Sequence, residues 1–383
     1  MTQSFASKNR RLSLVDSVSL ELEDLDLSRT LLIGVQHLCS STYALFKALE
    51  GHGLAPENTY LIGKCYSTNP RIVNFFEDDG FNISKFSNSF DKNTPYDLYF
   101  ENVILDNLDS IIKKSNLNKF EKIILLDDGG HLIKVFSNLN LNKIHNKIIG
   151  IEQTSSGLHI IDKKNIKFPI INVARSALKL NLETPLIVDL ATKTIKNKID
   201  KYKKNKVSKI LILGMGTIGQ SLKKNLEKEY EVFGFDINQK NKFIRSEEEL
   251  HQKMHVFDLV VGCTGKTSID SSRYKYLKSP VILASVSSSD REFDSYNFRA
   301  GYKHKISNSF EDITIDNITL CNCGFPITFD NDFDSIDTDE FQLTRAILFI
   351  SIYQAATENN QKDQVIELSS ILQDMIREKI KQK

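Results

Sequence analysis

A glycine-rich loop at residues 214–219 constrains the fold more than any other part of the chain. The loop follows the apolar run 210–213, and an amphipathic stretch with helical spacing follows the loop. The next apolar run leads into Asp236, 22 residues after Gly214. A strand, a G-x-G-x-x-G loop, a helix and a second strand in this order predict a dinucleotide-binding βαβ unit. The loop residues expected to contact the dinucleotide are Gly214, Gly216, Thr217, Ile218 and Gly219.

Each glycine has a physical role in such a loop. Gly214 permits a tight turn, Gly216 lets the backbone approach a pyrophosphate, and Gly219 lets the helix pack closely on the strand. The helix that starts here directs its first N–H groups and the positive end of its dipole at the anion. A carboxylate at Asp236 accepts hydrogen bonds from ribose hydroxyls and repels a 2′-phosphate, which predicts NAD and not NADP. The alternative is a tight turn in a Rossmann-like domain that binds no nucleotide.

Strand-like and helix-like segments alternate along the chain, which predicts an α/β fold with parallel sheets. We expect an N-terminal α/β substrate domain at residues 1–186, completed by helices within 326–383, and a Rossmann NAD-binding domain at 187–325. Residues 152–157 are expected to form a polar turn, 163–206 to connect the domains, and 339–383 to form two helices that pack on the chain or on a second copy. The predicted strands are 30–35, 59–62, 122–126, 148–151, 210–213, 231–235, 259–261 and 281–284, and the other predicted helices are 40–49, 71–76, 101–114, 174–191 and 217–230.

Charge and composition narrow the class of protein. The 50 basic and 49 acidic side chains give a net charge of +1, which offers no electrostatic basis for binding nucleic acid or an anionic membrane. The five cysteines lack zinc-site spacing, and no signal peptide or 18-residue apolar window is found. We therefore expect a cytoplasmic protein without a metal site that binds a small molecule and forms a homodimer or homotetramer.

Several short segments carry a further pattern in a common order and with matched spacing. They are Gly34–Leu38 (G-V-Q-H-L), Tyr66–Asn69 (Y-S-T-N), Leu126–Gly130 (L-D-D-G-G), Glu152–His159 (E-Q-T-S-S-G-L-H), Ile171–Val173 (I-N-V) and Asp258–Gly265 (D-L-V-V-G-C-T-G). Together they resemble the S-adenosylhomocysteine hydrolase superfamily across roughly residues 30–330, as a divergent member. That family uses NAD within one catalytic cycle to oxidise a ribose 3′-hydroxyl, eliminate a thiol, add water and reduce the ketone.

The resemblance implies roles for particular residues. Lys179 would act on the hydroxyl that is oxidised, Asp128 near the elimination step, and His37 near the sulfur side of the substrate. Glu183 stands where the family has an aspartate after the lysine. The further residues that the resemblance assigns to the cofactor are Thr154, Ser155, Ser156, Thr264, Gly265 and Asn322.

Each of these assignments has a plainer alternative. Asp128 also fits a strand-ending turn, His37 a packed histidine, and Lys179 a solvated helix residue. The neighbouring His131 replaces an acid of the family, and a surface role and a substrate role are both open for it.

The departures from the family lie on its substrate-binding residues. Gln153 replaces a glutamate, Ser288 and Phe325 replace two histidines, and Cys39 and Ser41 replace the threonine and glutamate that recognise adenine. Serine and phenylalanine cannot transfer protons as an imidazole does. We therefore expect an NAD-dependent enzyme that oxidises a hydroxyl of a nucleoside or related alcohol other than adenosylhomocysteine. The alternatives are a catalytically silent NAD- or nucleoside-binding regulatory protein and a dehydrogenase that releases NADH.

Overall fold

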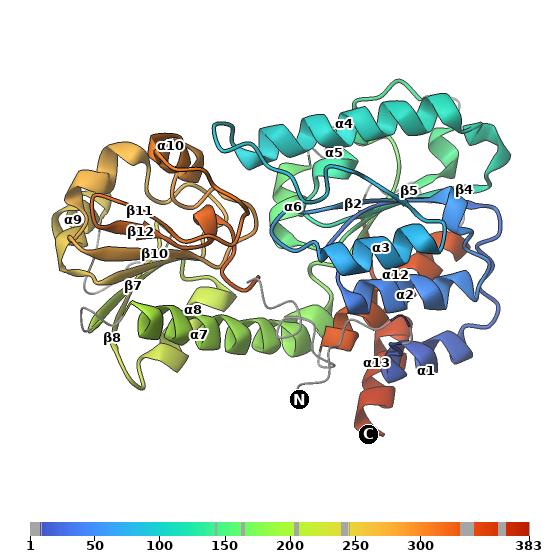
Figure 1. Ribbon diagram of the computed structural model, residues 1–383. Coiled ribbons are helices and arrows are strands. Elements are labelled where there is room, and N and C mark those ends of the chain that lie inside the picture. The colour runs from blue at the N-terminus through green and yellow to red at the C-terminus, as the bar shows by residue number, and fades with distance from the viewer. Residues whose placement is uncertain are drawn as a thin grey trace. The chain divides into compact units, whose positions relative to one another are not determined.

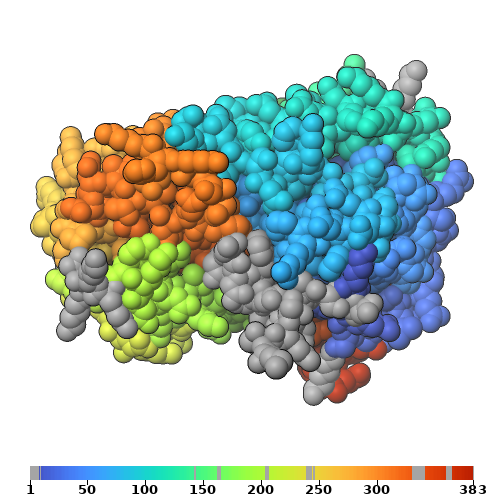
Figure 2. Space-filling view, viewed as in Figure 1, coloured from blue at the N-terminus to red at the C-terminus, as the bar shows by residue number. Residues whose placement is uncertain are grey.

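The structure is a computed structural model that divides the chain into two compact units (Figure 1). Unit 1 comprises Met1–Ser89, Phe100–Glu183 and Phe333–Lys383, and unit 2 comprises Phe90–Tyr99 and Thr184–Asp332. Figure 2 shows the surface of the molecule from the same side, coloured along the chain. The structure describes residues 8, 10–141, 144–161, 165–202, 207–238, 244, 246–329, 341–358 and 365–382.

Unit 1 contains a seven-stranded sheet in which every strand pairs in parallel with its neighbours. The strands are β1 (Thr30–Gln36), β2 (Thr59–Gly63), β3 (Asn82–Ile83), β4 (Lys122–Asp127), β5 (Ile148–Glu152), β6 (Ile170–Asn172) and β13 (Val365–Glu367). Their order is β13-β6-β5-β4-β1-β2-β3, so the direction of progression reverses between β1 and β4. Ligands of such sheets bind at the carboxyl ends of the strands beside this switch point.

Helices cover both faces of the unit 1 sheet, which explains why its central strands are continuous apolar runs. Helices α4 and α5 lie on one face, and α2, α3 and α12 lie on the other (Figure 1). The apolar side chains of α12 predicted to pack or to dimerise are largely buried within unit 1. The helices are α1 (Ser13–Glu21), α2 (Ser40–Glu50), α3 (Pro70–Asp78), α4 (Tyr96–Lys114), α5 (His131–Ser137), α6 (Ser155–Ile160), α12 (Gln342–Thr357) and α13 (Ser370–Lys381).

Unit 2 contains a six-stranded sheet of order β11-β12-β10-β9-β7-β8, parallel except at β11. Its switch point lies between β7 and β9. Helices α7 and α8 cover one face and α10 the other (Figure 1). The strands are β7 (Lys209–Leu213), β8 (Glu231–Phe235), β9 (Leu259–Gly262), β10 (Val281–Ser285), β11 (Ile313–Ile315) and β12 (Ile318–Leu320), and the helices are α7 (Thr184–Lys201), α8 (Thr217–Leu226), α9 (Glu247–Lys253) and α10 (Ser295–Gly301).

The α/β fold class and the eight predicted strands are confirmed, whereas several local predictions are wrong. The predicted turn at 152–157 contains the first residues of α6, because Thr154 caps that helix by accepting the Gly157 N–H at 3.0 Å. The predicted connection at 163–206 contains β6, which is an internal strand of the first sheet. The predicted helix 174–191 is a π-helical segment at Lys179–Glu183 followed by α7. Part of the connection, residues 203–206, lies outside the described residues.

The segment Phe90–Tyr99 belongs to unit 2 although it interrupts the sequence of unit 1. The fully buried guanidinium of Arg299 holds this segment. It bonds to Asp290 at 2.6 Å and lies over the rings of Phe90 and Phe325, 5.5 and 5.4 Å from their centroids. Asp290 in turn accepts the backbone N–H of Tyr96 at 3.2 Å. A buried ion pair thus fixes ten residues that no local sequence pattern assigns to this unit.

We expect Arg299→Ala to destabilise the protein by about 3–5 kcal/mol, because it leaves the Asp290 carboxylate buried without a counter-charge. Urea unfolding followed by circular dichroism measures this loss. Arg273→Ala is the control, since Arg273 pairs with Asp270 at the surface and its removal should cost less than about 1 kcal/mol. Equal unfolding midpoints for the two variants would show that Arg299 does not organise the segment.

Candidate active site

The glycine loop after β7 has the geometry that a pyrophosphate site needs. Gly214 has a φ of +91°, and a Cβ there would lie 2.8 Å from the carbonyl carbon of Cys263. A Cβ at Gly219 would lie 1.9 Å from the Gly214 oxygen. Neither position admits a side chain. Gly216 is the N-cap of α8, and a Cβ there would meet no atom within 4 Å. The backbone at the start of α8 therefore faces open space.

Asp236 follows β8 and contacts the same loop. Its carboxylate accepts the Met215 N–H and the Asn238 N–H, each at 2.8 Å. The next side chain, Ile237, is 69% exposed. A large apolar side chain left in water beside this carboxylate suits packing against a nucleotide base, and its position directly after the acid is the signal that the sequence prediction missed.

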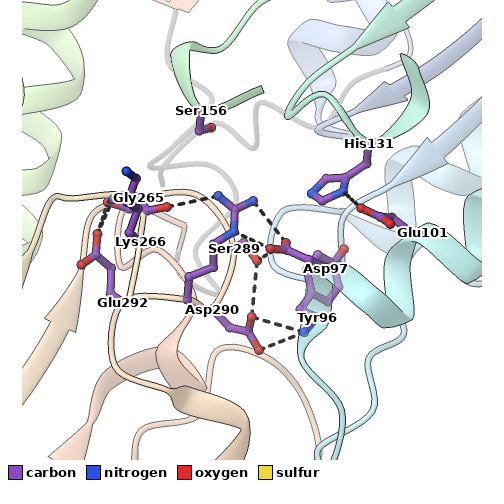
Figure 3. A network of polar contacts seen from close by, with 12 residues as sticks. Tyr96, Asp97, Glu101, His131, Ser156, Gly265, Lys266, Ser289, Asp290 and Glu292 are labelled. Atoms are coloured by element: carbon purple, nitrogen blue, oxygen red, sulfur yellow. Dashed lines mark hydrogen bonds and ion pairs between the residues drawn. The ribbon is translucent and has the colours of Figure 1, made fainter. Parts of the chain in front are cut away.

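Glu292 holds the segment Thr264–Gly265, which follows β9 across the switch point from the glycine loop. Its buried carboxylate accepts the N–H groups of Thr264 and Gly265 at 2.5 and 2.6 Å and the Ser287 hydroxyl at 2.6 Å. Figure 3 shows the Glu292–Gly265 contact and, nearby in unit 2, the contacts of Ser289 and Asp290. Burial raises the pKa of Glu292, although these hydrogen bonds oppose the rise. Ser287 lies in the segment where the adenosylhomocysteine hydrolases have a histidine, and it thus helps Glu292 to hold this loop.

Two further positions in unit 2 make contacts within the protein. They are Asn322, which was predicted to contact the cofactor, and Phe325, which replaces a histidine of the adenosylhomocysteine hydrolases. Asn322 is buried, its amide oxygen accepts from Lys198 at 2.8 Å, and its amide nitrogen donates to the Phe329 carbonyl at 2.6 Å. A cofactor amide would have to compete with these contacts. The ring of Phe325 is fully buried and packs against Phe90.

In unit 1, His37 and Asp128 meet at the switch point between β1 and β4. His37 Nε2 lies 3.3 Å from Asp128 Oδ2, and His37 Nδ1 lies 2.5 Å from the Ser67 hydroxyl. Asp128 also accepts from the Lys64 ammonium and from the Gln153 amide. Lys64 and the Gln153 contact were not predicted, although both residues directly follow strands at this edge of the sheet. The expected pair is therefore the centre of a largely buried cluster of five polar side chains, which includes Ser67, Lys64 and Gln153.

The charges in this cluster are fixed by one another. Burial alone would raise the pKa of Asp128, but Lys64 and His37 outweigh it and hold that pKa well below its ordinary value. Burial lowers the pKa of His37, which Asp128 only partly offsets. Burial also opposes the charge of Lys64, yet Asp128 keeps the pKa of that ammonium above its ordinary value. Asp128 is thus ionised and Lys64 protonated at neutral pH, and His37 is neutral.

Asp127 of β4 and Glu152 of β5 form a pair of acidic side chains, because they are register partners on adjacent strands. Both are fully buried. Burial raises the pKa of Asp127 to about 6 and, together with Asp127, raises the pKa of Glu152 well above its ordinary value. Glu152 accepts the N–H of Gly129 at 3.2 Å and of Thr154 at 2.7 Å, so this pair shapes the two loops that carry the polar cluster.

Lys179 and Glu183 occupy the π-helical segment, a rare geometry that is frequently found at functional sites. Their side chains form an ion pair of 3.1 Å, and the Glu183 carboxylate also accepts the Thr344 hydroxyl at 2.6 Å. Both side chains are largely buried.

The remaining expected residues lie elsewhere on unit 1. Ser155 and Ser156 are in the first turn of α6 after the cap at Thr154. His131 is buried and pairs with Glu101 at 2.9 Å, as Figure 3 shows, so it is not a surface side chain.

The described residues offer no metal centre, since no three His, Cys, Asp or Glu side chains among them are grouped to bind an ion. No described helix combines the length and the apolarity required to cross a lipid bilayer.

Comparison of the sequence with known proteins places the chain in a family. Two proteins of Mycobacterium tuberculosis strains, named uncharacterized protein MT0113 and uncharacterized protein Rv0104, are each 31% identical over 347 residues. The match covers 90% of this chain and 67% of each relative. The chain belongs to the family of these mycobacterial proteins. No protein-family model matches it.

Solved structures with a similar arrangement include two dipicolinate synthase A subunits and a dehydrogenase. The subunit from Bacillus halodurans has a TM-score of 0.40 at 12% identity, and the A chain from Bacillus subtilis 0.39 at 12%; they cover 87% of this chain and 99% and 98% of theirs. The NAD⁺-bound 3-phosphoglycerate dehydrogenase of Entamoeba histolytica has a TM-score of 0.40 at 11% identity over 87% of this chain and 99% of its own. These similarities are too low to bear on function.

We expect Asp127→Asn to stabilise the protein at pH 7.5 by up to about 3 kcal/mol. The pKa of Asp127 is about 6 in the folded chain and about 4 when unfolded, so the folded state holds more protons between these values. The free energy of unfolding therefore falls as pH rises from 4 to 6, and the asparagine removes that loss. Urea unfolding at pH 7.5 and 4.5 measures the free energy of unfolding of the variant and of the natural protein. The control is Asp106→Asn, at an exposed position of α4. A gain of equal size at both pH values would contradict the assignment.

Proposed function

We propose that the protein is an NAD-dependent enzyme that oxidises a hydroxyl group of a nucleoside or related alcohol. The observation that carries this proposal is the loop at 214–219, where two glycines admit no side chain, a third faces open space, and Asp236 bonds to the loop backbone. A helix N-terminus beside a carboxylate is the combination that selects a pyrophosphate and a ribose diol.

The residues of unit 2 fit NAD. The first-turn N–H groups at Thr217 and Ile218 have no partner within an α-helix and suit the pyrophosphate. Asp236 suits the adenosine ribose, and Ile237 suits the adjoining base. Gly265, with a φ of +68° and no atom within 4 Å of a Cβ, lets a ligand approach the loop after β9. When bound, NAD supplies a hydride acceptor.

The residues of unit 1 fit the alcohol. Lys179 is a partly buried amine that can hold the proton of a hydroxyl group, and Glu183 orients it through the 3.1 Å ion pair. The ionised Asp128 and neutral His37 can accept and donate hydrogen bonds to further hydroxyls. The resemblance to adenosylhomocysteine hydrolase supports these roles, and the pairing of Gln153 with Asp128 supports a different substrate, since a carboxylate at 153 would repel Asp128.

A silent NAD-binding protein is the second candidate. It is favoured by Phe325, which stands at a histidine position of the adenosylhomocysteine hydrolases and is packed as a buried ring instead. The second such position is Ser288, and its neighbour Ser287 bonds to Glu292. The two candidates differ in whether bound NAD is reduced when an alcohol is offered.

We expect the purified protein to contain NAD, or to take it up on incubation, as mass spectrometry of the acid-released nucleotide would show. Asp236→Asn should weaken NAD binding by about 10- to 100-fold, because one charged acceptor for the ribose is lost. Asp316→Asn, in the turn between β11 and β12, is the matched control and should bind as the natural chain does. Absence of NAD from the natural protein after incubation would end the proposal.

We expect Lys179→Met to lower the rate of NADH formation by about 10²- to 10⁴-fold when nucleosides and related alcohols are offered. NAD binding should be unchanged, because the residues assigned to the pyrophosphate and the ribose lie in the glycine loop and at Asp236. Lys193→Met, at an exposed position on α7, is the control. The absorbance of NADH reports the rate. An unchanged rate in the Lys179 variant would remove the lysine from the reaction, and no NADH from any variant would favour the silent protein.

A further inference from the structure

Arg345 on α12 is a charged side chain that neither the predicted chemistry nor the packing explains. It is 94% buried, with a relative exposure of 6%. Its Nε donates to the Ser41 hydroxyl at 3.0 Å and its Nη2 to the Cys39 sulfur at 3.2 Å. Its Nη1 is buried and has no hydrogen-bond partner among the described residues. Two neutral groups therefore hold the guanidinium by two of its nitrogens and leave the third unsatisfied.

The other buried cations of unit 1 near this edge of the sheet have a carboxylate, and Arg345 does not. Lys64 pairs with Asp128, and Lys179 pairs with Glu183. No ion pair to Arg345 is found among the described residues. Buried charges in proteins are paired or bind ligands, because an isolated charge out of water is costly. One positive charge in this part of unit 1 is thus left for a group that the chain does not supply.

The surroundings of Arg345 favour an anion. Cys39 is the N-cap of α2, and Ser41 lies in the first turn of this eleven-residue helix. The positive end of the α2 dipole and the guanidinium therefore meet at the same two residues. The charge of Arg345 also acts on His37, which lies just before the helix. The anion would consequently bind next to the cluster around Asp128.

We propose that Arg345 binds a carboxylate group of the substrate at the N-terminus of α2, so that the substrate is a hydroxy acid. This inference rests on the proposed function, since it names the substrate class of the same site. A carboxylate fits better than a phosphate, because one guanidinium nitrogen and one helix end match a single charge, whereas a phosphate dianion usually has several cationic partners.

The test uses acetate as the probe and acetamide as its uncharged counterpart, at constant ionic strength. The melting temperature of the full chain should rise by about 2 °C or more in acetate and stay unchanged in acetamide. Arg345→Met should abolish the acetate effect. Arg377→Met, which replaces a partly exposed arginine of α13, should retain it. Should Arg345→Met fail to fold, Arg345→Lys keeps the charge without the planar fork and should at least halve the shift.

The natural protein and its Arg345 variants together decide the proposal. An equal response to acetate and acetamide, or an acetate effect that survives Arg345→Met, would overturn it. A larger shift with inorganic phosphate than with acetate would overturn the carboxylate assignment. Failure of the proposed function looks different: NAD would be absent while the acetate response persisted. If the protein binds NAD but does not respond to acetate, only the inference of a hydroxy-acid substrate is contradicted.

Discussion

The close approach of backbone to backbone after β7 is the constraint on which the rest of unit 2 depends. Gly214 lies against the Cys263–Thr264 peptide, and Gly219 lies against the Gly214 carbonyl, so a side chain at either position would collide with main-chain atoms. This contact fixes where α8 begins and brings the two loops at the switch point together. Glu292 then holds the second loop through its N–H groups, and Asp236 holds the first. Two carboxylates thus hold the loops on either side of the switch point, and the amides at the start of α8 are left for an anion such as a pyrophosphate.

In unit 1 the loops at the switch point are likewise held by buried groups, but through contacts between charged side chains. The switch point between β1 and β4 gathers His37, Lys64 and Asp128 from three loops, and their mutual pairing keeps ionised groups buried. The acidic pair Asp127 and Glu152 lies directly behind, where burial raises the pKa of both carboxyls. Stability is given up there to shape the loops of the site, as is common where function sets the arrangement. Arg345 departs from this pattern, since it is a buried charge held in place by neutral partners.

The sequence predicts those parts of the fold that local pattern determines. Long apolar strands and the glycine loop are recognisable because several consecutive residues carry the signal. β6 and β13 are only three residues long, and they become strands through pairing with the sheet. Residues 90–99 join unit 2 because of Arg299, which lies some 200 residues further along the chain. The same limit applies to the site. His37 and Asp128 follow strands and are expected, whereas the partners Lys64 and Arg345 are defined by contacts across 64 and 304 residues of sequence.

The central claim is that the head of α8 binds the pyrophosphate of NAD. A crystal structure of the protein grown with NAD tests it most directly. We expect pyrophosphate oxygens within hydrogen-bonding distance of the amides at Gly216–Ile218, with the adenosine ribose hydroxyls on the Asp236 carboxylate. Crystals from saturating NAD that show no nucleotide at this loop, or a nucleotide bound elsewhere, would contradict it.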